Sequence, residues 1–192
     1  MRLLEERIIR EGRILEGDIL KVDSFVNHQV DMQLMSQLAK ELAARFASEP
    51  ITKVLTIEAS GIAFAGVVAL ELGVPMVFAK KHSHLYIDPD LLMAPVESFT
   101  TKNTYNAVVS RRYLSPDDVV LIVDDFLAAG RALSGLVDLC RQAGATVAGA
   151  GIIIEKAYQH GGDTLRASGL RIESMARIAS MDPAKGTIEF TS

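Results

Sequence analysis

The chain has 192 residues, 49% of them apolar, and a formal net charge of −4 from 20 Lys and Arg against 24 Asp and Glu. This composition is typical of one soluble globular domain and offers no basic surface for nucleic acid. A single cysteine, Cys140, excludes a disulfide framework, and no apolar run reaches the roughly 20 residues of a membrane span, so we expect a cytoplasmic protein without membrane contact.

The predicted elements start with a short amphipathic helix over residues 3–11, an irregular apolar segment, and a helix that Asp31 caps. Strands are then predicted over 54–57, 76–79, 105–110, 119–123 and 147–154, helices over 62–72, 131–142 and 162–167, and late strands over 171–179 and 186–190. Apolar strands that alternate with capped helices predict an α/β fold with a central, mostly parallel sheet flanked by helices. No repeat or linker interrupts the pattern, so residues 1–192 are expected to form a single domain.

Residues 80–104 differ from the regular pattern around them. They are polar, contain Pro89 and Pro95, and show no sustained period. A stretch of this length inside a compact domain is usually a lid, a binding loop or a separate hairpin. We expect a long flexible lid loop here, with Lys80 and Lys81 at its base.

The most informative segment runs from Val119 to Leu133, where an apolar strand ends in Asp124 and Asp125 and small residues lead into a helix. Ligands of open α/β sheets bind beyond the carboxyl ends of the strands. The small residues at 128–132 allow the backbone to wrap an anion, and its N–H groups and the helix amino terminus stabilise that charge. Two carboxylates repel phosphate, so they must hold another part of the ligand, and sugar hydroxyls are suitable donors. The segment therefore predicts a site for a phosphorylated ribose.

This arrangement resembles the phosphoribosyl pyrophosphate motif of the type I phosphoribosyltransferases. In that family the acidic pair holds the ribose hydroxyls, and the loop that follows cradles the 5′-phosphate. Two other phosphate motifs are absent from the sequence: no G-x-x-x-x-G-K-[ST] run occurs, and no G-x-G-x-x-G follows a strand.

The resemblance extends over nearly the whole chain to the xanthine phosphoribosyltransferases of bacteria, a branch of the type I family. Besides the segment 119–133, segments 20–29, 56–63, 77–82 and 152–156 match in identity, order and spacing. The resemblance implies the type I fold, with a small hood formed by residues 1 to about 30 and the C-terminal strands, and a lid over about 80–104. It also implies a homodimer and a role in purine salvage.

The activity that the resemblance implies is transfer of the 5-phosphoribosyl group from phosphoribosyl pyrophosphate to xanthine, which gives xanthosine 5′-monophosphate and pyrophosphate. Leu20 and Asn27 of the hood would contact the purine, and Lys156 would contact its exocyclic oxygen. The phosphate would be bound by Ala128, Ala129, Gly130, Arg131 and Ala132. A cation at the end of a buried strand donates to a carbonyl oxygen and not to an amino group, so the site should favour 6-oxopurines over adenine.

The main catalytic task in this reaction is to stabilise the departing pyrophosphate. Ala59, Ser60 and Gly61 form a small-residue turn between a strand and a helix, and are the expected pyrophosphate loop. Lys80 and Lys81 are expected to pair with the same charge as the lid closes and excludes water. The expected cofactor is Mg²⁺, bound mainly through phosphoribosyl pyrophosphate, and no metal site of the protein's own is predicted.

Two departures from the family pattern affect the expected chemistry. Many type I enzymes have threonine hydroxyls in the phosphate loop, where this chain has Ala129 and Ala132. Relatives that act on hypoxanthine and guanine carry an aspartate, placed to accept the imidazole proton of the base, where this chain has Ala128. We therefore hypothesise that no dedicated general base is used, and that the acidity of xanthine itself supplies an anionic nucleophile near neutral pH.

Each candidate residue also has a plainer interpretation. Asp124 and Asp125 are suitable caps for the helix that follows them, and Ser60 is suitable for its own helix. The lysines at 80 and 81 are equally compatible with a solvated role, and Lys156 with a surface ion pair to Glu155.

Two other functions remain open. One is a phosphoribosyltransferase for guanine or hypoxanthine, against which the missing carboxylate at Ala128 and the matching hood segment argue. The other is a non-catalytic regulator that senses phosphoribosyl pyrophosphate and binds DNA. The acidic balance argues against the regulator, as does the first strand near Val54, which leaves little room for a DNA-binding domain.

Overall fold

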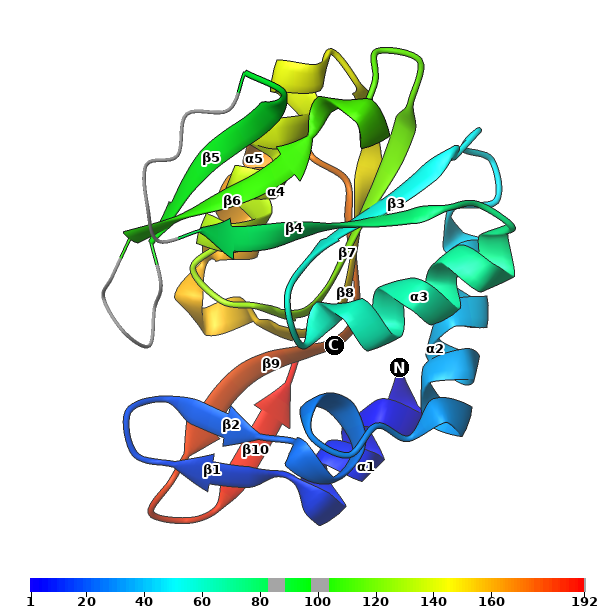
Figure 1. Cartoon of the computed structure of the whole chain (residues 1–192). Helices are drawn as coiled ribbons and strands as arrows, with labels where there is room; N and C mark the ends of the chain where they lie inside the picture. The colour runs from blue at the N-terminus through cyan, green and yellow to red at the C-terminus, as the bar shows by residue number, and fades with distance from the viewer. Residues whose placement is uncertain (83–88, 98–103, 192) are drawn as a thin grey trace.

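A central sheet of eight strands dominates the computed structural model, which describes residues 1–82, 89–97 and 104–191 (Figure 1). The strands are β3 (Lys53–Ile57), β4 (Met76–His82), β5 (Leu91–Glu97), β6 (Thr104–Ser110), β7 (Val119–Leu127), β8 (Thr146–Lys156), β9 (Ile172–Asp182) and β10 (Thr187–Phe190). Their order across the sheet is β10-β9-β8-β7-β3-β4-β6-β5. The run from β9 to β4 is parallel, whereas β10, β6 and β5 each pair antiparallel with their neighbours. The predicted α/β fold with a mostly parallel sheet is confirmed.

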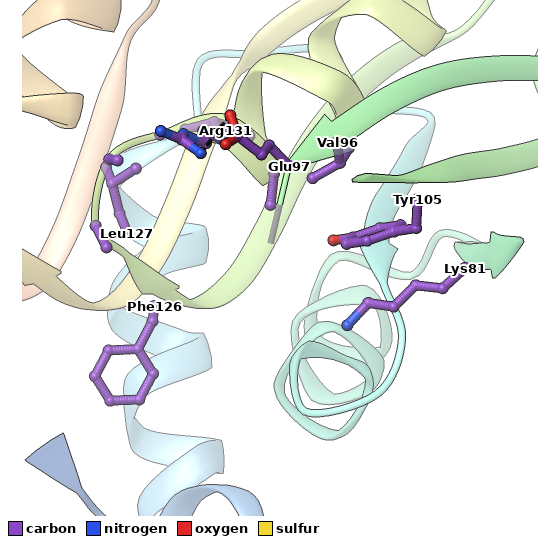
Figure 2. A pocket seen from close by; sticks show the side chains of 12 residues that line it. Lys81, Val96, Glu97, Tyr105, Phe126, Leu127 and Arg131 are labelled. Atoms are coloured by element: carbon purple, nitrogen blue, oxygen red, sulfur yellow. Dashed lines mark ion pairs between the residues drawn. The ribbon is translucent and has the colours of Figure 1, made fainter. Parts of the chain in front are cut away.

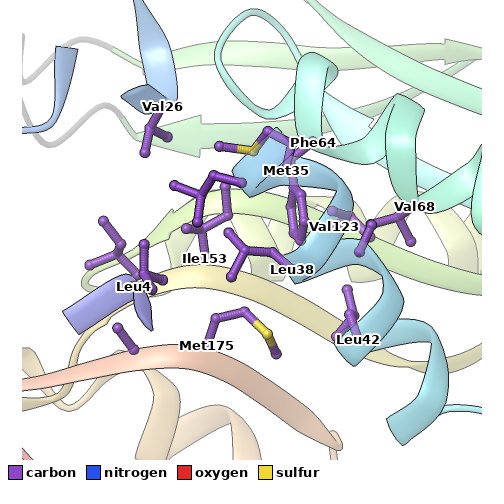
Figure 3. Packing of buried hydrophobic residues seen from close by; sticks show 14 of the residues in the cluster. Leu4, Val26, Met35, Leu38, Leu42, Phe64, Val68, Val123, Ile153 and Met175 are labelled. Atoms are coloured by element: carbon purple, nitrogen blue, oxygen red, sulfur yellow. The ribbon is translucent and has the colours of Figure 1, made fainter. Parts of the chain in front are cut away.

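Helices cover both faces of this sheet and enclose two hydrophobic cores. One core lies under α2 (Met32–Arg45) and α3 (Gly61–Leu72), where Leu38 and Phe64 meet Val123 of β7 (Figure 3). The other lies under α4 (Arg131–Ala143), and the short helix α5 (Gly161–Ala167) packs at its border. Alternate residues of β7 enter different cores, Val123 the first and Ile122 the second, as the pleat of a strand requires. The end of β7 is therefore held rigidly from both faces.

The first 30 residues form a separate small region beside the carboxyl ends of the central strands, which we call the hood. It consists of α1 (Arg2–Glu11), a hairpin of β1 (Arg13–Leu15) and β2 (Ile19–Lys21), and a π-helical turn over Asp23–Asn27. Helix α1 contacts β9 and β10, so the two ends of the chain lie together in this part of the molecule (Figure 1). The hood shares the core of α2 and α3, because Leu4 and Phe25 are fully buried in it.

Two local expectations have clear outcomes. The Asp31 cap is confirmed, since its carboxylate accepts the N–H groups of Gln33 and Leu34 at 3.1 Å each, at the start of α2. The expectation of a loop is wrong for residues 91–97, which form β5. Pro95 in the middle of this segment hid the strand, but β5 is an edge strand and tolerates a residue without an N–H group.

Apart from β5 and the residues next to it, the structure describes only the two borders of the predicted lid. Lys80 and Lys81 belong to β4, and Thr104 begins β6. Residues 83–88 and 98–103, to which the prediction of a flexible lid also applies, lie outside the described residues. Among the helices that the structure describes, none has both the length and the apolar character that crossing a membrane requires.

Candidate functional site

The site begins at the carboxyl end of β7, which delivers Asp124 and Asp125. Both side chains are nearly inaccessible to solvent, at 6% and 7% of full exposure, and the Asp125 N–H donates to Asp124 Oδ1 at 3.0 Å. Burial and the neighbouring Asp125 carboxylate together raise the pKa of Asp124 well above its ordinary value, while Lys81 opposes the rise. Such a concentration of buried negative charge favours hydroxyl donors as ligands for this pair.

The turn from β7 into α4 depends on Gly130. Its φ of +80° lies in the left-handed region, where residues with a side chain are strained, so the chain turns here directly into α4. The Gly130 carbonyl accepts from the backbone N–H and from the hydroxyl of Ser134, each at 2.9 Å. Because Ala128 and Ala129 carry only methyl groups, nothing bulky shields the main chain of the loop from an incoming anion.

The opposite side of this loop rests on Gly161, the first residue of α5. A Cβ atom at Gly161 would lie 2.2 Å from the Ala128 carbonyl oxygen and 2.6 Å from the Gly130 nitrogen, distances that real contacts do not reach. The sequence analysis did not identify Gly161 as part of the site. Its contact with the loop is formed by the fold, and no local pattern predicts it.

A cavity of about 170 Å³ opens in front of the loop. It is lined by Lys81, Val96, Glu97, Tyr105 and residues 126–133 (Figure 2). The Lys81 ammonium lies 5.2 Å from the centre of the Tyr105 ring, and Arg131 pairs with Glu97 at 2.5 Å. The predicted phosphate-loop residues 128–132 therefore line one cavity, and Lys81 borders it from β4.

A second cavity, of about 400 Å³, lies between the hood and the loop before α3. Asn27 of the hood, Ala59, Ser60 and Lys81 are among the residues that line it. Lys81 thus contributes to both cavities, which places the predicted pyrophosphate loop next to the predicted phosphate loop. The hood approaches the same space through Asn27.

The predicted pyrophosphate loop is locked to β4 and β7. The peptide bond between Glu58 and Ala59 is cis, and Glu58 accepts the Lys81 N–H at 2.6 Å. A Cβ atom at Gly61 would lie 2.7 Å from Asp124 Oδ1, so the start of α3 packs directly on the acidic pair. Ser60 occupies the N-cap position but makes no side-chain cap hydrogen bond, so the interpretation of Ser60 as a plain cap is wrong.

Lys156 ends β8 and is 8% exposed. Burial lowers the pKa of its ammonium, and the nearby charge of Asp18 opposes that shift. The alternative pairing with Glu155 does not occur. Glu155 accepts from Arg166 at 2.7 Å and from Arg177 at 3.2 Å, whereas Lys156 donates to the backbone carbonyl of Asp18 in the hood.

The predicted site residues that line neither cavity are Gly61, Asp124, Asp125, Lys156, Leu20 and Lys80. Of these, Leu20 and Lys80 belong to other parts of the molecule. Leu20 is 6% exposed, and its side chain packs in the hood core. Lys80 lines a separate groove with Phe78 and Tyr113, because successive residues of a strand point to opposite faces. Side chains that the prediction missed are Glu97, Tyr105 and Asp18, which no local motif distinguishes.

No protein metal centre is seen in the part of the chain that the structure describes. Within it, no group of three or more His, Cys, Asp or Glu side chains could hold a metal ion. Cys140 belongs to α4 and is fully buried. Burial raises the pKa of its thiol to about 12, which suits packing and not nucleophilic attack.

A family model described as "Phosphoribosyl transferase domain" matches residues 21–168. Curated relatives named xanthine phosphoribosyltransferase, from Bacillus cereus and Bacillus cytotoxicus, are 52% and 51% identical to the chain over 190 residues. These alignments cover 99% of the chain and 95% of each relative. The similarity therefore includes the hood, both loops and Lys156.

Solved structures with the same architecture include adenine phosphoribosyltransferases. The enzyme from Giardia lamblia, complexed with 9-deazaadenine, matches with a TM-score of 0.68 and 30% identity over 76% of this chain and 80% of that one. The enzyme from Rhodothermus marinus matches with a TM-score of 0.75 over 92% of this chain and 99% of that one, at 22% identity, which concerns the fold alone.

Proposed function

The chain belongs to the phosphoribosyl transferase domain family, and from that premise we propose that it transfers the 5-phosphoribosyl group of phosphoribosyl pyrophosphate to xanthine in purine salvage. The products are xanthosine 5′-monophosphate and pyrophosphate. The observation that carries this function is the small-residue loop that follows the buried carboxylates of β7, at the carboxyl ends of the parallel strands. The near full-length similarity to proteins named xanthine phosphoribosyltransferase supports the choice of base.

The phosphoribosyl group is held by the loop and the acidic pair. Main-chain N–H groups of residues 128–132 bind the 5′-phosphate, each contributing about 1.5–3 kcal/mol for a hydrogen bond to a charged group. Asp124 and Asp125 accept hydrogen bonds from the ribose hydroxyls. The cavity of about 170 Å³ in front of the loop is the proposed place of this phosphate. The base then binds toward the hood, where Asn27 lines the second cavity.

The purine binds between the hood and the end of β8 in this proposal. Asn27 and the backbone near Leu20 contact the base, and the Lys156 ammonium donates to its exocyclic oxygen. An amino group at that position of the base would leave the buried ammonium without an acceptor, which disfavours adenine. The positive charge of Lys156 also stabilises a xanthine anion, so no carboxylate is needed at Ala128.

The reaction forms a bond from a purine nitrogen to C1 of the ribose while the bond from C1 to the pyrophosphate oxygen breaks. The electron pair of the broken bond leaves with pyrophosphate. Backbone N–H groups of Ala59, Ser60 and Gly61 and the Lys81 ammonium stabilise the charge that develops there. Lys80 would act on the same charge only if the lid brings it to the site.

Carboxylate oxygens are the donors that Mg²⁺ prefers, and Asp124 and Asp125 provide them at the ribose end of the site. The described residues offer no larger set of ligands. We therefore assign Mg²⁺ mainly to the oxygens of phosphoribosyl pyrophosphate, where it would neutralise the leaving group. We also propose that the enzyme is cytoplasmic and forms a homodimer.

Pyrophosphate release tests the function directly. The protein is incubated with phosphoribosyl pyrophosphate, Mg²⁺ and xanthine, guanine, hypoxanthine or adenine in turn. We expect the highest kcat/KM with xanthine and the lowest with adenine. A preference for guanine or hypoxanthine would mean that this base, and not xanthine, is the substrate. Absence of pyrophosphate release with every base would contradict the proposed function.

The pH dependence tests the role of the xanthine anion. If xanthine reacts as its anion, kcat/KM for xanthine rises through the ionisation of the base. With guanine, which ionises at higher pH, the rise should be displaced to higher pH. A xanthine profile that does not follow its ionisation would indicate a general base on the protein.

A further inference from the structure

The buried Lys156 ammonium has one hydrogen-bond partner among the described residues, and this partner comes from the other end of the chain. It is the backbone carbonyl oxygen of Asp18, in the turn between β1 and β2 of the hood. A lysine ammonium has three donors, so two remain for a ligand. The turn of the hood thus contacts the residue that the proposed function assigns to the recognition of the base.

The Asp18 side chain is bonded to the segment that directly follows Lys156. One carboxylate oxygen accepts from the Tyr158 hydroxyl at 2.5 Å, and the other accepts from Gln159 Nε2. The tyrosine hydroxyl and the glutamine amide occupy both oxygens, so the lysine is contacted only by the carbonyl of the same residue. Asp18 is therefore bonded at three points to the short stretch 156–159.

The conformation of the turn explains why an aspartate is suitable here. Gly17 and Asp18 have φ values of +77° and +66°, in the left-handed region. Aspartate and asparagine tolerate this region better than other residues with a side chain. The turn therefore aims the Asp18 carbonyl at Lys156 while the carboxylate points to Tyr158 and Gln159.

We propose that Asp18 is a positioning residue that fixes the Lys156 ammonium for the exocyclic oxygen of the purine and thereby sets the preference for 6-oxopurines. This proposal rests on the proposed function. A lysine has a flexible four-carbon stem and three freely rotating donors, so by itself it discriminates poorly between acceptor positions. The fixed carbonyl holds one donor, and the other two then point in defined directions.

Electrostatics support the same role. Burial lowers the pKa of Lys156, and the Asp18 carboxylate opposes that shift and so favours the protonated ammonium. Tyr158 is the other titratable group beside Asp18, and burial together with the hydrogen bond to Asp18 raises its pKa. Glu155, the neighbour of Lys156 in β8, is bonded to two arginines of its own. Asp18 is therefore the acidic group that acts on Lys156.

The test compares Asp18→Asn and Asp18→Gly with the wild-type enzyme in steady-state kinetics. Both variants keep a backbone carbonyl and tolerate a positive φ, but asparagine is neutral and glycine has no side chain to anchor the turn. We expect KM for xanthine to rise about tenfold with asparagine and more with glycine, since one hydrogen bond to a charged group is weakened. KM for phosphoribosyl pyrophosphate should stay unchanged, and the kcat/KM ratio of xanthine over adenine should fall.

Two readouts separate positioning from a general loss of structure. In Asp18→Asn the pKa of Lys156 loses the support of the carboxylate and falls, so the basic limb of the kcat/KM profile for xanthine moves to lower pH. In addition, Asp18→Asn added to Lys156→Met should raise KM for xanthine no further than Lys156→Met alone, because Asp18 acts through the lysine. The matched control is Glu16→Gln, an exposed acid in the same turn, which should leave all parameters unchanged.

The outcomes distinguish the two proposals. Suppose that the wild-type enzyme releases pyrophosphate with xanthine, but that the Asp18 variants keep its KM, base ratio and pH profile. This result would overturn only the role of Asp18 and leave the proposed function intact. Additive effects in the double variant would also overturn it. A wild-type enzyme without activity on any purine would overturn the proposed function, and the role of Asp18 with it.

Discussion

Gly161 and Gly130 meet behind the loop that we assign to the phosphate. The space between α5 and the loop is so narrow that a single methyl group at Gly161 would collide with the Ala128 carbonyl oxygen, the Ala129 carbon and the Gly130 nitrogen. These are main-chain atoms, which cannot rotate away as the end of a side chain can. The amide directions that the phosphate needs are therefore fixed from behind.

Replacing Gly161 with alanine should displace the loop and weaken the binding of phosphoribosyl pyrophosphate. Losing one amide hydrogen bond to the phosphate costs about 1.5–3 kcal/mol, so KM for phosphoribosyl pyrophosphate should rise at least about tenfold. KM for xanthine should change less. The control is Gly66→Ala, since a Cβ atom at Gly66 in α3 has no neighbour within 4 Å. Equal kinetics for both variants would show that the loop tolerates the methyl group.

Lys81 and Lys80 are adjacent in sequence but face different parts of the molecule. Lys81 lines both cavities of the site, while Lys80 lines a groove on the other side of β4. We therefore expect Lys81→Ala to lower kcat by about tenfold or more, the order of one charged hydrogen bond, with little change in KM for xanthine. Lys80→Ala should have a smaller effect. Steady-state kinetics with both substrates measure the difference. A larger loss of kcat for Lys80→Ala than for Lys81→Ala would mean that the lid brings Lys80 to pyrophosphate.

At the scale of elements, an ionic network joins β8, α5 and β9. Glu155 of β8 is 1% exposed in its side chain and accepts two hydrogen bonds from Arg166 of α5 at 2.7 Å each. Ser174 and Arg177 of β9 donate to the same carboxylate at 2.5 and 3.2 Å. Because α5 begins at Gly161, this network also holds the support of the phosphate loop in place.

Replacing Glu155 with glutamine should destabilise the fold by about 3 kcal/mol, which is the lower end of the cost of breaking a buried ion pair. We expect the lower end because both arginines are partly exposed and water can solvate them. Urea unfolding at pH 7 would measure the loss. The exposed Glu71 of α3 gives the control Glu71→Gln, which should stay within about 0.5 kcal/mol of wild type. A loss for Glu155→Gln no larger than that of the control would contradict a structural role for the network.

The same network predicts a dependence on pH. Although burial works against it, the hydrogen bonds of Arg166 and Ser174 hold the pKa of Glu155 below its ordinary value. A carboxylate whose pKa is lower in the folded than in the unfolded state stabilises the fold at pH values above its unfolded-state pKa. This stabilisation is lost as the pH falls through its folded-state pKa. The stability difference between wild type and Glu155→Gln should therefore be full at pH 7 and shrink in the acid range below about pH 4.3, the ordinary pKa of a glutamate.

The elements also show what sequence patterns can predict. The end of β7 and its loop are recognisable because the apolar run, the acid pair and the small residues lie within one short stretch, and the fold uses them locally. By contrast, Pro95 interrupts the sequence pattern of β5, and the strand tolerates this residue because it lies at the edge of the sheet. The contacts of Asp18 with Lys156 and of Gly161 with the loop join distant parts of the chain, and local patterns do not reveal such partners.

At the scale of the whole molecule, an apolar groove of about 370 Å³ crosses the side of the sheet at β4 and β6. Met76, Phe78, Leu91, Val108 and Tyr113 are among the residues that line it. Phe78 and Tyr113 are 37% and 61% exposed, and aromatic side chains commonly anchor interfaces. This groove is the surface at which we expect a second copy of the chain to bind.

Replacing both Phe78 and Tyr113 with serine should weaken the homodimer that we propose. Burial of an aromatic side chain at an interface contributes about 2 kcal/mol or more, so two such losses should lower dimer affinity by a factor of about 10³. Light scattering during size-exclusion chromatography would report a dimer for wild type and a monomer for the variant at micromolar concentration. Leu70→Ser is a matched control, since Leu70 is 81% exposed on α3 and does not line the groove. A dimer that persists in the double variant would place the interface elsewhere, and a monomeric wild type would contradict the dimer itself.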